Sequence, residues 1–332
     1  MADSLYFYCE TAFNHEGDSN YMKGLIDASV ATGAQGVKFQ ILFSPNDLFS
    51  KHHTQYKEVE KWIFSPTEWE FFISYALSRG LDVIAMPLDY GAINFLSTRQ
   101  ALIKYIELHS VMWKDISFNK ALRKLKIPLA IGTGGRSLKE IKEMVSFYGE
   151  QVSVLIHGFQ SYPTLLEDSR LEKISILAEN FPNLHIGYAD HLSHDDPSLT
   201  EVNKYALLLG ASVFEKHLTL TQEEERVDNS SASDKRTVRT IIKELFRFES
   251  KIFYNKALGF STLTAPEIKY ATREKKAVAA KTIKVGKVLD NDKIAFKMID
   301  DPKAINDIKN CLNKRATTLI KKDCTLNPRD FK

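Results

Sequence analysis

The sequence has few cysteines, no long apolar segment and little net charge. Its three cysteines, Cys9, Cys311 and Cys324, have neither the spacing of a disulfide framework nor that of a zinc site. No stretch approaches the roughly 20 apolar residues of a membrane span, and residues 1–10 lack the basic and apolar regions of a secretion signal. The net charge of +3 indicates neither a nucleic-acid nor a membrane-surface partner. We therefore expect a protein of the reducing cytoplasm, with no nucleic-acid and no membrane partner.

What the chain does contain is a regular alternation of apolar segments. Hydrophobic residues make up 44% of the 332 residues, which is enough for a large core. Short β-rich runs alternate with helix-like segments, the pattern of repeated βα units around a parallel sheet. We predict an α/β fold, a (β/α)8 TIM barrel over residues 1–258, with the segment Leu42 to Trp62 covering its mouth. The predicted strands are Leu5–Cys9, Gly36–Ile41, Leu81–Met86, Lys104–Leu108, Pro128–Ile131, Val152–His157, Leu184–Tyr188 and Ser212–Lys216.

The pattern changes toward the C-terminus. There, short apolar runs joined by turns replace the alternation of strands and helices, which predicts a linker over residues 259–270 and a small β-rich domain over residues 271–332. The runs are Lys276–Ala280, Lys281–Val285 and Ala316–Ile320. Basic residues concentrate after about residue 235, and we interpret them as a solvated surface.

Two of the predicted strands lead directly into histidines. The run that ends at Tyr188 is followed by His191, and the run that ends at Lys216 is followed by His217. A lone histidine in a barrel is more often a packing residue than a metal ligand. The carboxyl ends of barrel strands meet at one rim, however, so these two imidazoles could hold one divalent cation that polarises a substrate carbonyl.

Lys38 is a further candidate for chemistry. It alternates with the apolar Val37 and Phe39, so its side chain should point into the barrel. A buried amine needs an anionic partner, and two kinds of partner are possible. One is a structural salt bridge to Glu10 or Glu215, and the other is a substrate anion. Together with the histidine pair, the second possibility describes an anionic substrate next to a metal-bound carbonyl.

These residues lie in motifs that resemble the sialic acid synthase family. In order, the motifs are Glu10-Thr-Ala-Phe-Asn14-His15, Gly33-Ala-Gln-Gly-Val-Lys38-Phe39-Gln40, Ala85-Met-Pro87-Leu-Asp89, Gly132-Thr133-Gly134, Ser161-Tyr162-Pro163, Gly187-Tyr-Ala-Asp190-His191 and Glu215-Lys216-His217. The resemblance covers nearly the whole chain. It implies a TIM barrel followed by an antifreeze-protein-like (SAF) domain, which in the family covers the barrel of the other subunit of a domain-swapped homodimer. It also implies that phosphoenolpyruvate condenses with a sugar aldehyde, such as an N-acyl hexosamine, to give a nonulosonic acid, with a divalent metal ion (Mn²⁺ or Mg²⁺).

The resemblance assigns roles to individual residues. His191 and His217 become the metal ligands, and Glu10 becomes the acid/base candidate. Lys38 would bind phosphoenolpyruvate, and Tyr162 would complete the catalytic set beside the acceptor sugar. The implied substrate-binding residues are Gln40, Ser110, Thr133, Gln160, Asp190, Glu215 and Asp228.

The chain departs from the family at several of these positions. Glu107 stands where the family has a second phosphate-binding lysine, and Met298 stands where it has an acceptor-binding arginine. Gly132 replaces a serine, and Gln160 replaces a serine or asparagine. An acid facing a phosphate reduces affinity, so two alternatives stay open. One is a metal-dependent pyruvate-type aldolase, whose donor carries less charge, and the other is a non-catalytic sugar-binding homologue.

Overall fold

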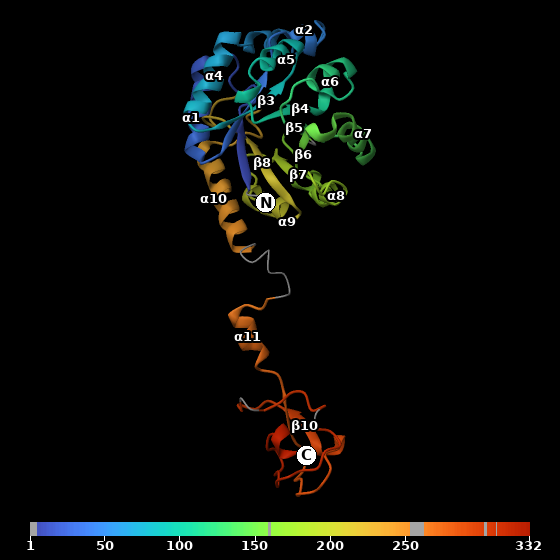
Figure 1. The fold of residues 1–332 in the computed structure, drawn as a ribbon. Helices are drawn as coiled ribbons and strands as arrows, with labels where there is room; N and C mark the ends of the chain where they lie inside the picture. Colours follow the sequence, from blue (N-terminus) through green and yellow to red (C-terminus); the bar gives the residue numbers. More distant parts are fainter. Residues whose placement is uncertain (1–4, 159–160, 253–261, 302–303, 310) are drawn as a thin grey trace. The chain divides into compact units, whose positions relative to one another are not determined.

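The chain folds into two compact units, Met1–Tyr254 and Asn255–Lys332. A computed structural model describes residues 5–158, 161–252, 262–301, 304–309 and 311–332 (Figure 1). The boundary that the sequence predicts at residue 258 lies outside the described residues and stays a prediction.

The first unit is a closed barrel of eight parallel strands in sequence order (Figure 1). The barrel closes because β8 pairs in parallel with β1 as well as with β7. The predicted TIM barrel is therefore confirmed, and each strand lies within one or two residues of its predicted bounds. The strands are β1 (Tyr6–Glu10), β2 (Gly36–Ile41), β3 (Asp82–Pro87), β4 (Tyr105–Leu108), β5 (Leu129–Gly132), β6 (Val152–Gly158), β7 (His185–Asp190) and β8 (Ala211–His217).

Helices follow the strands and form the outer layer of the barrel. Two of them begin at capping boxes, which Ser65 and Ser137 each form with a glutamate three residues later. None of the helices in the described ranges is both long and apolar enough to cross a membrane. The helices are α1 (Ser19–Thr32), α2 (Pro45–Leu48), α3 (Tyr56–Val59), α4 (Pro66–Ser78), α5 (Tyr90–Ser97), α6 (Ile116–Leu122), α7 (Leu138–Tyr148), α8 (Glu172–Asn180), α9 (Leu199–Leu208) and α10 (Lys235–Ile252).

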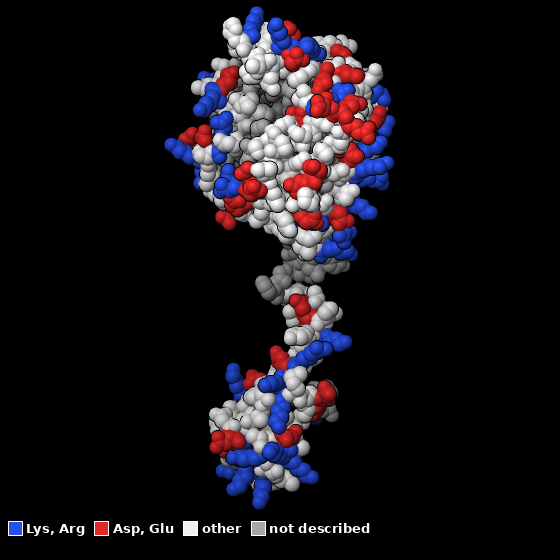
Figure 2. Space-filling model, turned by 180° about the vertical axis from the view of Figure 1, so that it is seen from behind, with Lys and Arg blue, Asp and Glu red and all other residues white. Residues whose placement is uncertain are grey.

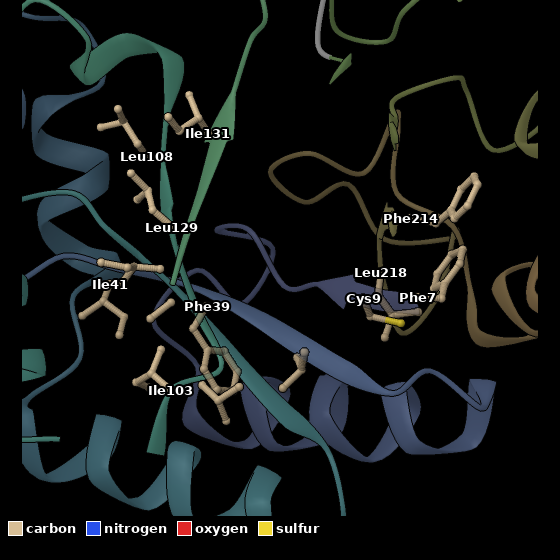
Figure 3. Close-up of a cluster of buried hydrophobic side chains, with 14 of the residues drawn as sticks. Phe7, Cys9, Phe39, Ile41, Ile103, Leu108, Leu129, Ile131, Phe214 and Leu218 are labelled. Atoms are coloured by element: carbon tan, nitrogen blue, oxygen red, sulfur yellow. The ribbon is translucent and has the colours of Figure 1, made fainter. Parts of the chain in front are cut away.

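Side chains along each strand alternate between the helix layer and the barrel interior. On β1, Phe7 and Cys9 pack in the layer between strands and helices, where Phe7 stacks on Phe214 of β8 with ring centroids 6.5 Å apart (Figure 3). Tyr8 belongs instead to a separate apolar cluster contributed by several strands. Because the period of a strand is two residues, Glu10 shares the inward face with Tyr8. The alternation therefore directs a carboxylate into the barrel where β1 ends.

The second unit is small and rich in irregular β structure. It contains α11 (Ala265–Ala271) and an antiparallel pair, β9 (Lys276–Ala279) and β10 (Ile294–Lys297). The other two runs that the sequence predicts contribute an isolated bridge between Ile283 and Ile320. Lys and Arg side chains gather on this unit (Figure 2). Its core is formed by Ala277, Ala279, Ile283, Leu289, Cys311, Ala316, Ile320, Leu326 and Phe331.

Candidate active site

The candidate site lies at the carboxyl ends of the barrel strands, where inward-facing polar residues of neighbouring strands meet. The strand register places Glu10 of β1 opposite Lys38 of β2 on one side and opposite His217 of β8 on the other. The Glu10 carboxylate contacts both, since its Oε2 is 3.0 Å from Lys38 Nζ and 2.8 Å from His217 Nε2. Glu10 therefore links the buried lysine to one of the two predicted metal ligands.

The Lys38 ammonium is held by three carboxylates rather than one. Besides Glu10, it contacts Glu107 Oε2 at 2.9 Å and Glu215 Oε2 at 2.6 Å. All four groups are buried. Burial opposes the charged form of Lys38, but the three carboxylates hold its pKa above its usual value. The structural salt bridge that the sequence left open for Lys38 is thus present, and a substrate anion would have to compete with it.

The three carboxylates differ in how readily they ionise. Burial opposes ionisation of Glu10, but Lys38 and His217 hold its pKa well below the usual value. Burial raises the pKa of Glu107, and the nearby charge of Glu10 adds to the effect while Lys38 opposes it. Burial and the charge of Glu10 likewise raise the pKa of Glu215. Glu10 is therefore the carboxylate of this group that most readily carries the negative charge.

The predicted metal ligands lie side by side. The rings of His191 and His217 are 4.7 Å apart, and ligand atoms of His191, Glu215 and His217 lie within 4.8 Å of one another. His191 Nδ1 is 3.1 Å from the carbonyl oxygen of Ala189, and burial followed by the charge of His217 lowers the pKa of His191 well below its usual value. Neutral imidazole is the form that binds metal ions.

A metal ion fits this set of side chains. His217 Nε2 faces the Glu10 carboxylate at 2.8 Å and therefore carries the proton of the neutral ring, which leaves Nδ1 as an acceptor. This Nδ1 is buried and has no hydrogen-bond partner among the described residues. Two imidazoles and one carboxylate are a donor set suited to divalent cations, Mn²⁺ among them. The residues present therefore match the ion that the sequence predicts, and they add Glu215 to the two predicted histidines.

A cavity of about 610 Å³ opens over these groups. Nine of the predicted site residues line it: Glu10, Lys38, Gln40, Ser110, Tyr162, His191, Glu215, His217 and Asp228. Gln40 is oriented by a hydrogen bond from its Nε2 to Glu10 Oε1 at 2.7 Å. A volume of this size is typical of small-molecule sites. The structure thus brings most of the predicted residues into one chamber.

Two other predicted site residues in the described ranges, Thr133 and Asp190, are not among those lining the cavity. Thr133 donates through Oγ1 to the carbonyl oxygen of Ile156 at 2.9 Å. The Asp190 carboxylate accepts from Leu192 N at 2.9 Å and from Asn203 Nδ2 at 3.1 Å. Gln160 lies outside the described residues. Their substrate-binding roles stay predictions.

Asp228 reaches the cavity from the loop after β8. Its backbone has a φ of +68°, which residues other than glycine seldom adopt. Asn14 holds this loop by donating from Nδ2 to the carbonyl oxygen of Val227 at 2.8 Å. Burial and the charge of Glu10 raise the pKa of Asp228 to about 7. The loop therefore places an acid close to the Glu10 end of the chamber.

Sequence reasoning missed the apolar wall of the cavity. Phe49, Gln55, Val59 and Trp62 line it, and all four come from the segment that was expected to cover the barrel mouth. Phe13 packs beside them, with its ring centroid 5.6 Å from that of Trp62. The aromatic residues of the segment were visible in the sequence, but their spacing follows no helix or strand period.

Comparison with known proteins agrees with this site. The NeuB family profile matches residues 25–256. An N,N'-diacetyllegionaminic acid synthase of Legionella pneumophila is 26% identical over 264 residues, which cover 73% of this chain and 71% of that protein. The N-acetylneuraminate-9-phosphate synthase of Mus musculus is 26% identical over 344 residues, which cover 97% and 91%.

Solved structures share the fold. A Chromobacterium violaceum protein, described as a spore coat polysaccharide biosynthesis protein E, superimposes with a TM-score of 0.83 at 20% identity, covering 99% of this chain and 100% of that one. The N-acetylneuraminic acid synthetase of Leptospira borgpetersenii, solved with citrate, gives a TM-score of 0.71 at 22% identity, covering 81% and 92%. The family profile spans well over half of the chain. The chain therefore belongs to the NeuB family of sialic acid synthase-like transferases, which condense phosphoenolpyruvate with a sugar.

Proposed function

We propose that this chain condenses phosphoenolpyruvate with an aldose, forming a 3-deoxy-2-keto acid of the nonulosonic type. The observation that carries the proposal is the Glu10 carboxylate, which contacts Lys38 and His217 at once. A donor anchored near Lys38 and an acceptor carbonyl near the two histidines would meet at this carboxylate. An acid/base group at that meeting point is what the condensation needs.

The reaction balances as follows. C3 of phosphoenolpyruvate attacks the aldehyde carbon, which forms the new C–C bond and leaves an alkoxide that takes up a proton. Water then adds at C2 and loses a proton, and phosphate leaves with cleavage of the C–O bond. Glu10 would carry these protons; its Oε2 lies within hydrogen-bonding distance of Lys38 Nζ and His217 Nε2, the groups proposed to meet the donor and the acceptor.

The other residues of the chamber bind and orient the substrates. His191, His217 and Glu215 would hold the metal ion, whose contribution is to polarise the acceptor carbonyl. Lys38 would bind the donor anion by exchanging one of its carboxylate contacts for it. Gln40, which is held by Glu10, and Tyr162, whose ring centroid lies 6.4 Å from that of His217, face the acceptor.

A metal-dependent aldol addition of pyruvate is the second candidate. It is favoured by the contact between Glu107 and Lys38, because the carboxylate of Glu107 lowers the affinity of the site for a highly charged donor. Competition between pyruvate and phosphoenolpyruvate in a thermal-shift assay separates the two reactions. Tighter binding of pyruvate would favour the aldolase.

The test of the first proposal is phosphate release. Purified protein with Mn²⁺ or Mg²⁺ and phosphoenolpyruvate should release phosphate when one of a panel of N-acyl hexosamines and plain aldoses is added. Replacing His191 and His217 together by Ala should abolish release and metal binding. The matched control is His185→Ala, because His185 is an exposed histidine of β7 and is not among the residues that line the cavity.

Several outcomes would contradict the proposal. Absence of phosphate release across the panel would contradict the synthase. Unchanged metal content in the double variant would instead favour a non-catalytic sugar-binding protein. The homodimer that the family resemblance implies stays a prediction, which light scattering of the purified protein would test.

A further inference from the structure

We propose that His109 is a further residue that binds phosphoenolpyruvate, donating a hydrogen bond from Nε2 to an anionic oxygen of this substrate. The inference rests on the proposed function, because it adds a residue to the phosphoenolpyruvate end of the same chamber. His109 is not among the site residues assigned above. It lies two residues beyond Glu107, the acid at the position where the family resemblance implies a phosphate-binding lysine.

His109 follows the last residue of β4 and lies on the inward side of the barrel. Its backbone is still extended, with φ −65° and ψ 140°, so the alternation of β4 continues to this residue. Leu108 packs in the layer between strands and helices, whereas Glu107 contacts Lys38 Nζ in the barrel interior at 2.9 Å. His109 therefore shares the inward direction of Glu107, and it lines the cavity. Because β4 lies opposite β8 in this closed barrel, His109 is on the wall across from His217.

The hydrogen-bonding form of His109 is fixed by the backbone. Its Nδ1 accepts a hydrogen bond from Val111 N at 3.1 Å. A backbone amide can only donate, so Nδ1 carries no hydrogen and the hydrogen of the neutral ring is on Nε2. Burial, followed by the positive charge of Lys38, lowers the pKa of His109 to about 4, so the ring is neutral at pH 7. His109 is therefore an uncharged hydrogen-bond donor through the ring nitrogen that is farther from its backbone.

The charges of the chamber favour a further hydrogen-bond donor for phosphoenolpyruvate. Among the described residues that line the cavity, Lys38 is the sole lysine or arginine. Its ammonium already contacts Glu10, Glu107 and Glu215 within 3.0 Å. The carboxylate and phosphate of the substrate lose hydration in the cavity, which costs free energy unless their oxygens accept hydrogen bonds. Hydrogen bonds to charged acceptors are the stronger kind, so an Nε2–H group on the wall of Glu107 offsets part of the repulsion from that carboxylate.

Glycine at position 132 leaves space next to the end of β4. β5 pairs with β4 and ends at Gly132, and both Gly132 and Gly134 line the cavity. A Cβ added at Gly132 would lie 3.5 Å from the carbonyl oxygen of Leu108 and 3.9 Å from Glu107 Oε1, which are ordinary contact distances. A side chain would therefore fit here, and its absence lets ligand oxygens approach the wall that carries His109.

Two substitutions separate this role from a purely structural one. His109 also caps the short 3-10 helix η3 (Ser110–Met112) through the hydrogen bond from Val111 N. In His109→Asn, the amide oxygen takes the place of Nδ1, so the cap is kept and the outer N–H group is lost. In His109→Gln, the amide N–H group reaches the place of Nε2, whereas no acceptor remains at the place of Nδ1.

The experiment is isothermal titration calorimetry with phosphoenolpyruvate, using the full-length protein with Mn²⁺. His109→Asn should raise the Kd for phosphoenolpyruvate at least tenfold, and His109→Gln should stay within threefold of the wild type. The matched control is His185→Asn, at an exposed position of β7 that is not among the cavity residues, and it should leave the Kd unchanged. An unchanged Kd in His109→Asn would overturn the proposal. So would a loss of affinity in His109→Gln that equals or exceeds the loss in His109→Asn, the order that a cap alone predicts.

Failure of this inference and failure of the proposed function look different. If the variants bind as expected but no aldose causes phosphate release, the proposed function is wrong while the role of His109 stands. If phosphate is released and His109→Asn binds phosphoenolpyruvate as tightly as the wild type, the function stands while the role of His109 is wrong. A wild type that does not bind phosphoenolpyruvate would overturn both. The binding and turnover measurements together therefore assign any negative result.

Discussion

Glu107→Gln should strengthen the binding of phosphoenolpyruvate. The carboxylate of Glu107 contacts Lys38 Nζ at 2.9 Å, and the family resemblance places Glu107 where a lysine would bind the donor phosphate. Gln has nearly the same shape and can still accept a hydrogen bond from Lys38. Lys38 keeps Glu10 at 3.0 Å and Glu215 at 2.6 Å, so the fold should lose little stability.

The size of the effect follows from Coulomb's law. Two unit charges about 6 Å apart repel by about 3 kcal/mol at an effective dielectric constant of about 20. The raised pKa of Glu107, which burial causes, reduces its mean charge and therefore the repulsion. A gain of about 1.4 kcal/mol corresponds to a tenfold change in Kd. We therefore expect the Kd for phosphoenolpyruvate to fall at least tenfold.

Isothermal titration calorimetry with Mn²⁺ present gives this Kd directly. Pyruvate carries fewer negative charges, so its Kd should change less than that of phosphoenolpyruvate. Glu143→Gln, at an exposed position of α7, controls for the loss of one charge from the protein as a whole. An unchanged or weaker affinity for phosphoenolpyruvate in Glu107→Gln would refute the placement of the phosphate next to this residue.

Three further predictions concern stability. Burial lowers the pKa of His15 to about 3, so below an unfolded pKa of about 6.5 the unfolded state binds a proton that the folded state does not bind. Between pH 7 and pH 5, the free energy of unfolding of the wild type, measured with urea, should therefore fall by about 2 kcal/mol more than that of His15→Gln. Equal losses in the two proteins would count against this. Gly158 has a φ of +151°, and an added Cβ would lie 2.3 Å from the carbonyl oxygen of Ala189. Gly158→Ala should therefore lower the free energy of unfolding by about 3 kcal/mol in the same assay. A neutral effect would contradict the strain argument. Lys216 is buried, and its Nζ lies 3.5 Å from Asp190 Oδ1. Lys216→Met should lower the free energy of unfolding by about 3 kcal/mol, because it removes one partner of a buried ion pair. A stabilised variant would show that the pair is dispensable.

The barrel could be predicted from the sequence because each strand is signalled locally. An apolar run of four to seven residues between helix caps is visible without any knowledge of the rest of the chain. The alternation along β1 and β8 likewise predicts that Glu10 and His217 face inward. His191 and His217 could be paired because β7 and β8 are consecutive in the sequence and adjacent in the barrel.

The contact between Lys38 and Glu107 could not be predicted in the same way, although the sequence did name Glu10 and Glu215 as partners of Lys38. Glu107 comes from β4, which does not pair with β2, and the two side chains meet because they extend across the barrel interior. That meeting depends on strand tilt and stagger, which leave no local signal in the sequence. The apolar wall from the segment between β2 and α4 escaped prediction for a related reason, since a loop has no periodic pattern. Long-range geometry, rather than residue type, is what the structure adds.

The most direct test of the proposed reaction follows one oxygen atom. Phosphoenolpyruvate labelled with ¹⁸O at the oxygen that joins C2 to phosphorus is incubated with the protein, Mn²⁺ and an N-acyl hexosamine, and both products are analysed by mass spectrometry. The proposed reaction gives one 3-deoxy-2-keto acid for each phosphate released, with the label in the phosphate. Absence of the keto acid, or retention of the label in it, would contradict the proposed condensation.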